Sequence, residues 1–130
     1  MAELTVNVVS AERALWSGEA KSVVAKTPEG EIGILAGHEP VLALLVEGPL
    51  RIELPDGAKL LVAVHGGFFS VANNEVQVIA EVAELAEDIS IERAKEALAR
   101  AQAAGPELDE RAVRRAETRL SVAAAAAPLR

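Results

Sequence analysis

Residues 73–84, Asn-Asn-Glu-Val-Gln-Val-Ile-Ala-Glu-Val-Ala-Glu, contain the pattern that decides the fold of the first part of the chain. Apolar side chains stand at every second position in it: Val76, Val78, Ala80 and Val82. This alternation is typical of a strand with one buried face, and the two asparagines before it are a turn signal. Residues 4–8 alternate in the same way. We therefore predict a β-strand near each end of a β-domain.

Short apolar runs lie between these two strands, at residues 41–46 and 60–64. They are bounded by turn signals: Pro28-Glu29-Gly30, Gly48-Pro49 and Pro55-Asp56-Gly57. Short strands separated by frequent turns predict an antiparallel β-sandwich or barrel.

The chain changes character after Glu84 and becomes rich in alanine and arginine. Ser90 is a suitable helix N-cap, and Glu92 follows in the first turn. Apolar residues recur at helical spacing on both sides of Gly105-Pro106: Ile91, Ala94, Leu98, Ala101, then Leu108, Ala112, Val113, Ala116 and Leu120. A break this short predicts two antiparallel helices. The expected fold is segregated α+β, with a sandwich or barrel at 1–86 and a two-helix hairpin at 87–130.

Alanine favours helix formation but buries little surface. We therefore expect the hairpin to be weakly docked on the β-domain, which makes it a candidate moving part. The alanine run 123–127 is expected to extend the second helix.

Composition and charge exclude several functions. The 130 residues include no cysteine and two histidines, so we expect no metal site. The net charge of −7 argues against nucleic-acid binding, and all of this excess lies before Leu85. No apolar stretch reaches the roughly 20 residues that span a bilayer, and no signal peptide precedes the first strand. An intracellular soluble protein is expected.

Candidate catalytic groups are sparse. His38 is interpreted as a turn histidine that bonds to backbone, and His65 as a strand-end residue. The carboxylate pairs Glu29/Glu31 and Glu87/Asp88 are interpreted as solvated charges. No nucleophile elbow or phosphate-cradling loop is present, so we expect no catalytic residue.

An arginine stripe marks the second helix, with Arg111, Arg115 and Arg119 four residues apart and Arg114 beside them. One interpretation is a solvated face, balanced by nearby acidic residues. The other is a docking surface for an acidic partner or a phosphate-bearing ligand, which Arg93 and Arg100 of the first helix would join.

Two motifs resemble the epsilon subunit of F-type ATP synthases. The first is residues 30–40, Gly-Glu-Ile-Gly-Ile-Leu-Ala-Gly-His-Glu-Pro. The second is His65-Gly66-Gly67-Phe68, followed by Val71, Asn74, Val76, Val78, Ile79, Ala80, Glu81, Ala83 and Glu84. The order of a β-domain and then two helices also matches, so the resemblance covers essentially the whole chain.

The resemblance implies a non-catalytic subunit of the central rotor stalk on the cytoplasmic face of the cell membrane. The sandwich would bind the gamma subunit and the c-ring, the latter through Glu31 and the His38 loop. The hairpin would lie folded on the sandwich or extend into the catalytic head, where it inhibits ATP hydrolysis. In the extended form, basic residues would meet the catalytic beta subunits: Arg111, Arg114, Arg115 and Arg119.

Some members of that family bind ATP on the folded hairpin. The resemblance places that site at Glu84, Ile89, Arg93, Ala94, Arg100, Arg115 and Arg119. The family's [IL]-D-x-x-R-A motif has Ser90 here in place of the aspartate, which keeps the cap and removes a charge. We therefore expect weak regulatory ATP binding or none, and no other cofactor.

Two alternatives come from other classes of protein. One is a free-standing β-sandwich adaptor that recognises a partner with its helical arm. The other is a small hydrolase that uses His38 or His65.

Overall fold

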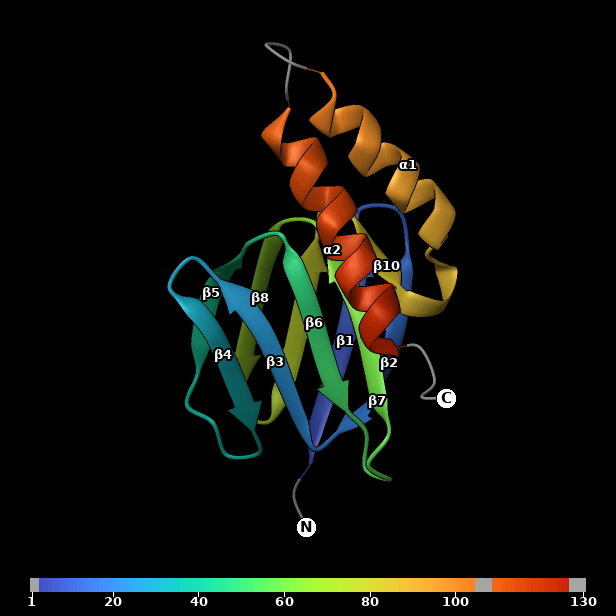
Figure 1. Ribbon diagram of the computed structural model, residues 1–130. Coiled ribbons are helices and arrows are strands. Elements are labelled where there is room, and N and C mark those ends of the chain that lie inside the picture. The colour runs from blue at the N-terminus through green and yellow to red at the C-terminus, as the bar shows by residue number, and fades with distance from the viewer. Residues whose placement is uncertain (1–2, 105–108, 127–130) are drawn as a thin grey trace.

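The computed structural model describes residues 3–104 and 109–126, the side chain of Ala126 excepted. Its two parts are a β-sandwich and a pair of helices, of which the second lies against one sheet of that sandwich and the first lies beside the second (Figure 1). Residues 105–108, which include the predicted Gly105-Pro106 break, and residues 127–130 lie outside the described residues.

Two five-stranded sheets form the sandwich. The first sheet has the order β2 (Ala14–Ala20), β1 (Leu4–Ser10), β9 (Glu75–Ala80), β8 (Gly67–Ala72) and β5 (Val41–Leu45). The second has the order β10 (Ala83–Leu85), β7 (Lys59–Val64), β6 (Gly48–Glu53), β3 (Ser22–Thr27) and β4 (Gly30–Leu35). The predicted sandwich is confirmed. One strand pair departs from the antiparallel pattern, because β1 runs parallel to β9.

The core lies between the two sheets and is almost entirely aliphatic. Val6 and Val8 of β1 face inward beside Val76 and Val78 of β9, and all four are fully buried. Phe69 is the one aromatic side chain among the fully buried residues described. The alternating patterns that predicted β1 and β9 therefore mark the inward faces of paired strands.

The turn between β8 and β9 is made by Asn73 and Asn74, whose φ angles are 52° and 62°. Asparagine tolerates this left-handed conformation better than most side chains, and two such residues in succession suit a tight hairpin. The predicted turn at this pair is confirmed, and it places β8 and β9 in antiparallel register.

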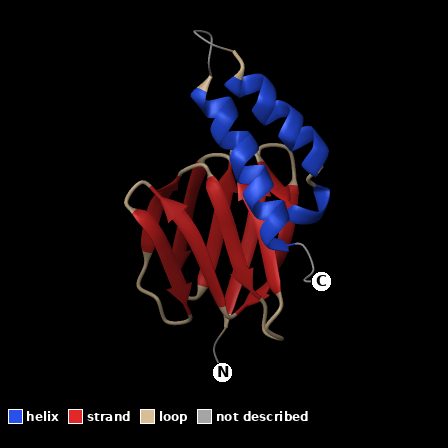
Figure 2. Cartoon of the chain, in the orientation of Figure 1, coloured by secondary structure: helices blue, strands red, loops and turns tan. Residues whose placement is uncertain are grey.

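The helical part begins after the short 3-10 helix η1 (Ala86–Asp88). Helix α1 (Ile91–Gln102) has Ser90 as its N-cap, and the Ser90 Oγ accepts a hydrogen bond from the Arg93 backbone N–H at 3.2 Å. Helix α2 (Glu110–Ala126) follows beside α1 (Figure 2). The predicted cap and helix pair are confirmed. Neither helix in the described part of the chain is long and apolar enough to cross a membrane.

Candidate functional site at the contact between hairpin and sandwich

Helix α2 lies on the outer face of the second sheet, over β7 and β6 (Figures 1 and 2). At the centre of this contact, Val122 is fully buried against Leu61 and Ala63 of β7. Ala86 and Ile89, which lead into α1, pack at the edge of the same cluster. The hairpin is therefore in its folded position, held by few and mostly small apolar side chains.

Strand β7 has an unbroken apolar run in its sequence, and the alternating pattern used for the other strands does not explain it. Four consecutive residues, Leu61 to Val64, are buried. Two of them, Val62 and Val64, face the sandwich core, while Leu61 and Ala63 face α2. An unbroken apolar run is typical of a strand covered on both faces. This run could have located the docking surface of the hairpin.

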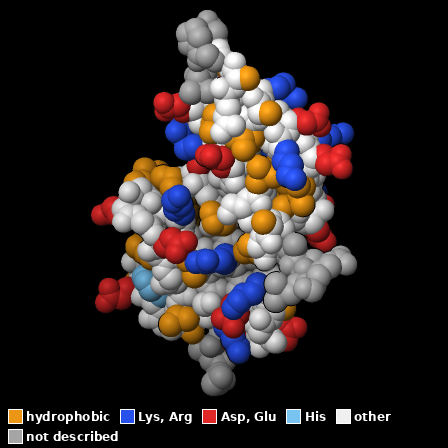
Figure 3. Space-filling model, in the orientation of Figure 1, with side chains coloured by type: hydrophobic (Ala, Val, Ile, Leu, Met, Phe, Trp, Pro, Cys, Tyr) orange, Lys and Arg blue, Asp and Glu red, His pale blue; other side chains and the backbone are white. Residues whose placement is uncertain are grey.

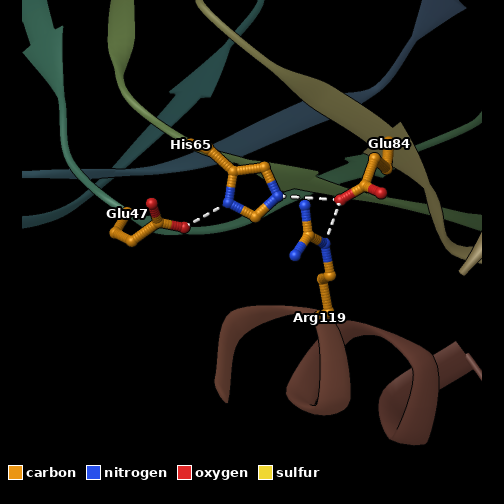
Figure 4. A network of polar contacts seen from close by, with 4 residues as sticks. All are labelled: Glu47, His65, Glu84 and Arg119. Atoms are coloured by element: carbon orange, nitrogen blue, oxygen red, sulfur yellow. Dashed lines mark hydrogen bonds and ion pairs between the residues drawn. The ribbon is translucent and has the colours of Figure 1, made fainter. Parts of the chain in front are cut away.

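Four polar side chains join the two parts beside this apolar contact (Figure 4). The Arg119 Nε of α2 donates to Glu84 Oε1 of β10 at 2.6 Å. The same oxygen lies 2.9 Å from His65 Nε2, and the other ring nitrogen, Nδ1, contacts Glu47 Oε2. We call Glu47, His65, Glu84 and Arg119 the latch network.

Backbone geometry positions His65 and Glu84. Glu84 pairs with Ala63 across β10 and β7, and the His65 N–H donates to the Val82 carbonyl at 2.9 Å. The chain then turns sharply at Gly67, which has a φ of +131°. A Cβ at this position would lie 2.2 Å from the Ile79 carbonyl oxygen, so only glycine fits there.

The latch network clearly changes the pKa of one of its members, the Glu84 carboxyl. The hydrogen bond from His65 is the largest influence on the pKa of the Glu84 carboxyl and lowers it below its usual value. Burial opposes this by raising the pKa, and the Arg119 guanidinium lowers it further by hydrogen bonding and by charge. Glu84 is thus held in its ionised form.

A cleft of about 440 Å³ opens next to the latch network. It is lined by residues of both parts of the fold: Lys26, Val46, Glu47, His65, Gly66, Glu81, Arg111 and Arg114. Acidic and basic side chains intermingle on this side of the molecule (Figure 3). The described residues include no group of three or more acidic or histidine side chains placed to hold a metal ion.

The residues expected to bind a nucleotide do not form one cluster in the structure. Glu84 and Arg119 form an ion pair with each other, and Arg115 lies 4.0 Å from Asp109 of its own segment. Arg93 and Arg100 are exposed on α1, Ala94 is buried, and Ile89 is half-buried at the docking contact. Glu84 and Arg119 are thus the members of this set that an ion pair brings together.

The arginines expected to dock on a partner differ in their exposure. Arg111 and Arg114 are exposed and line the cleft, and Arg114 lies 3.8 Å from Glu110. Arg115 and Arg119 are half-buried. The folded hairpin therefore leaves the first half of the arginine stripe accessible and occupies Arg119 in the latch network.

The two residues expected to face a ring of subunits lie on the sandwich. Glu31 is exposed on β4 and lies 3.3 Å from Arg51 of β6. His38 sits in the turn after β4, where its backbone N–H bonds to the Leu35 carbonyl and its Nδ1 lies 2.7 Å from the Glu39 carbonyl. The interpretation of His38 as a turn histidine is confirmed.

His65 was interpreted as a strand-end residue, and it does follow β7 directly. The sequence did not indicate that its side chain is buried between two carboxylates. The partners lie 18 and 19 residues away along the chain, so no local motif marks them.

An exposed apolar row crosses the outer face of the other sheet. Leu44, Phe68 and Ile79 are direct neighbours across β5, β8 and β9. Leu42 extends the row along β5, and Leu42 and Leu44 are 72% and 65% exposed. We call these four residues the apolar row. Contiguous exposed apolar side chains of this kind mark interaction surfaces.

Together, the fold and these sites define a class of protein: a small β-sandwich with a helical hairpin docked on one sheet and an exposed apolar row on the other. Residues 3–86 match the family described as ATP synthase, Delta/Epsilon chain, beta-sandwich domain. The chain belongs to this family, as an epsilon chain of the bacterial type.

Two curated relatives illustrate the match. The ATP synthase epsilon chain of Streptomyces avermitilis is 48% identical over 124 residues, which cover 95% of this chain and 98% of the relative. The epsilon chain of Rhodococcus opacus is 56% identical over 100 residues, which cover 76% of this chain and 82% of the relative. The family assignment makes the chain a central-stalk subunit of F-type ATP synthase that has a structural and regulatory role and not a catalytic one.

Solved structures agree with this assignment. A chain from the mitochondrial ATP synthase of Euglena gracilis, solved as OSCP/F1/c-ring in rotational state 1, superposes with a TM-score of 0.74 at 28% identity. The match covers 95% of this chain and 79% of that one. A chain from the central stalk and c-ring of the Tetrahymena thermophila enzyme shares the fold, with a TM-score of 0.61 at 14% identity and 96% coverage of both chains.

Proposed function

We propose that this chain couples rotation of the c-ring to the catalytic head of the ATP synthase and inhibits ATP hydrolysis through its C-terminal hairpin. The observation that carries the proposal is the position of α2, which is docked on the sandwich through one small apolar cluster and the latch network. Burying a valine side chain contributes only about 1.5–3 kcal/mol. A contact centred on Val122 is therefore weak enough for a reversible switch.

The apolar row is the proposed binding surface for the gamma subunit. It lies on the outer face of the sheet that α2 does not cover, so it stays accessible when the hairpin is folded. Its members are large side chains in register across three neighbouring strands. A rotor subunit must hold a permanent partner, and a contiguous apolar surface supplies the area for that.

The gamma contact is tested with the double variant Leu42→Ser/Leu44→Ser. Because both leucines are exposed, the variant is expected to fold normally while its affinity for an isolated gamma subunit falls about a hundredfold or more. The matched control is Leu35→Ser, which removes a leucine 64% exposed on the other sheet. Equal effects of the two variants on the dissociation constant would place the gamma subunit elsewhere.

The inhibitory role is tested with a catalytic complex that lacks its own epsilon subunit. The full chain is expected to bind and to lower the rate of ATP hydrolysis, and a truncation that ends at Glu87 is expected to bind without inhibiting. If both bind and neither inhibits, the chain serves coupling alone.

The arginine stripe supplies the proposed contact with an acidic segment of the catalytic beta subunits. Arg111 and Arg114 are exposed on the folded hairpin, and Arg115 and Arg119 become available when α2 leaves the sandwich. Arg111→Gln/Arg114→Gln is expected to weaken inhibition without weakening gamma binding, because both residues belong to α2, which is docked on β7 and β6, whereas the apolar row belongs to the other sheet. The exposed control is Arg93→Gln on α1.

The c-ring contact is assigned to Glu31 and the loop around His38. Both are on the sandwich, which fits a subunit that sits on the ring at the cytoplasmic face of the cell membrane and associates with the membrane through the complex. Glu31→Lys is expected to lower coupling between proton flow and ATP synthesis, as measured in vesicles with the reassembled enzyme. Unchanged coupling would remove Glu31 from this contact.

Nucleotide binding to the folded hairpin is proposed to be weak or absent. Ser90 serves as a helix cap through its hydroxyl, and Glu84 and Arg119 satisfy each other. A nucleotide would have to compete with that ion pair. The test is titration with ATP followed by amide NMR, in which saturable shifts at Arg93 and Arg100 at micromolar ATP would contradict the proposal.

A further inference from the structure

His65 is a buried titratable side chain that lies between two carboxylates. Its side chain is only 2% exposed. Both ring nitrogens face carboxylate oxygens, Nε2 that of Glu84 at 2.9 Å and Nδ1 that of Glu47. These carboxylates come from β10 and from the connection between β5 and β6.

The number of protons on the ring decides whether both contacts are favourable. An ionised carboxylate can only accept hydrogen bonds, and a neutral imidazole has a single N–H to donate. With both carboxyls ionised, both contacts are therefore hydrogen bonds only when the ring carries a proton on each nitrogen. In the neutral ring, one nitrogen lone pair would face a carboxylate oxygen, and the buried ring has little access to water that could separate the two.

Glu84 connects this ring to the hairpin. A single oxygen, Oε1, accepts from His65 Nε2 and from the Arg119 Nε of α2 at 2.6 Å. Among the described residues, the Arg119–Glu84 contact is the ion pair that joins α2 to a strand of the sandwich. A change that displaces Glu84 therefore acts directly on the docked position of α2.

We infer that His65 is the positioning residue of a proton-linked latch: the doubly protonated imidazole orients Glu84 toward Arg119 and so holds the hairpin folded. Loss of the proton on Nε2 removes the hydrogen bond to Glu84, and the hairpin undocks more often.

Other charged groups border the same site from the elements packed around it. They line the adjoining cleft: Lys26 of β3, Glu81 after β9, and Arg111 and Arg114 of α2. These groups lie beside the latch network, whereas the hydrogen bonds of the ring go to the carboxylates of Glu47 and Glu84. The carboxylates of Glu47 and Glu84, which contact the ring directly, therefore determine how many protons the ring needs for both hydrogen bonds.

The test is NMR of the full chain between about pH 5 and pH 9, the range in which histidine changes charge. The ring ¹⁵N shifts of His65 report its protonation state, and the methyl signals of Val122 and Leu61 report docking. We expect the docked population to be largest where the ring is doubly protonated. We also expect a tenfold to hundredfold rise in the undocked population as the ring loses a proton, which is the effect of losing one charge-assisted hydrogen bond. A docked population that stays constant while the His65 ring loses a proton would overturn the inference.

Two substitutions separate His65 from other titrating groups. The His38→Gln variant removes the exposed turn histidine and should keep the pH response of docking. The His65→Gln variant should dock more weakly and lose the response, and a response that survives in it would contradict the latch. If His65→Gln does not fold, the ring ¹⁵N shifts of the His38→Gln protein are compared with its Val122 and Leu61 methyl signals, and docking that does not follow the ring protonation contradicts the latch. Arg115→Gln, a change at a half-buried arginine of the same helix outside the latch network, is the control for helix charge.

The regulatory meaning of the latch rests on the proposed function, because only an inhibitory hairpin makes its release consequential. The latch itself is measured on the isolated chain. If docking of the hairpin depends on pH but the chain does not inhibit ATP hydrolysis, the proposed function is rejected and the latch is retained. If the chain inhibits hydrolysis and docking does not depend on His65, the latch is rejected and the proposed function is retained.

Discussion

At the residue scale, the members of the second motif, His65-Gly66-Gly67-Phe68, have different structural roles. Gly67 permits the turn, His65 occupies the buried end of β7, and Phe68 contributes to the apolar row. Because each residue meets a different requirement, substitutions at neighbouring positions should affect different properties: folding at Gly67, hairpin docking at His65 and partner binding at Phe68.

Gly67→Ala is expected to destabilise the sandwich by about 3 kcal/mol or more. The new Cβ would overlap the Ile79 carbonyl oxygen, and the φ of +131° is strained for any side chain. Gly33→Ala is the matched control, because a Cβ at that position meets no atom within 4 Å. Urea unfolding followed by the fluorescence of Trp16 measures both. A loss below 1 kcal/mol at Gly67 would contradict this account.

Glu84 should make hairpin docking sensitive to acid. Since its pKa is lowered in the folded chain, the stability it contributes is present above the ordinary carboxyl value of 4.5 and is lost as the pH falls through its folded value. The difference in docking between the wild-type chain and Glu84→Gln should therefore shrink below about pH 4.5. Methyl NMR of Val122 measures it. Glu87→Gln, at an exposed position nearby, should show no such change with pH.

At the scale of elements, the two helices differ in what holds them. Helix α2 contacts β7, β6 and η1, whereas α1 packs chiefly on α2. Ala94 is the buried residue of α1. Helix α1 therefore depends on α2 for its position, and the two should leave the sandwich together.

Hydrogen exchange should show residues 91–102 and 110–125 opening together and at lower free energy than the strands of the sandwich. Val122→Ala should lower the opening free energy of both helices by roughly 1.5 kcal/mol, because it removes two buried methyl groups at the centre of the contact between α2 and β7. Val82→Ala, at an exposed valine of the sandwich, serves as the control. Equal protection of helices and strands in the wild-type chain would argue against a mobile hairpin.

At the scale of the whole molecule, the two proposed functional surfaces lie on opposite sides of the sandwich. The hairpin covers the second sheet, and the apolar row lies on the outer face of the first. The rigid core between them keeps the two surfaces separate. A subunit built in this way can keep hold of one partner while its hairpin moves.

Affinity for the gamma subunit should therefore not depend on the state of the hairpin. The dissociation constant of the truncation that ends at Glu87 is expected to lie within about twofold of that of the full chain, a difference below 0.5 kcal/mol. Isothermal titration calorimetry measures both. A tenfold difference would show that the hairpin contributes to the gamma contact.

The local patterns of the chain were sufficient to predict most of the fold. Alternating side chains identified β1 and β9, Asn73-Asn74 predicted the turn that precedes β9, and Ser90 predicted the start of α1. These signals work because the period of a strand, the conformation of a turn and the cap of a helix depend on residues close together in the chain.

Local patterns could not predict that β1 runs parallel to β9. The alternation of side chains did not show which sheet α2 covers, although the unbroken apolar run of β7 could have marked it. Local patterns also could not place His65 between Glu47 and Glu84, or Arg119 on the same carboxylate oxygen. The sequence by itself determined the elements and their faces, through interactions between near neighbours. Only the tertiary structure decided the latch network, because burial and hydrogen bonding there depend on groups that packing brings together from four distant segments.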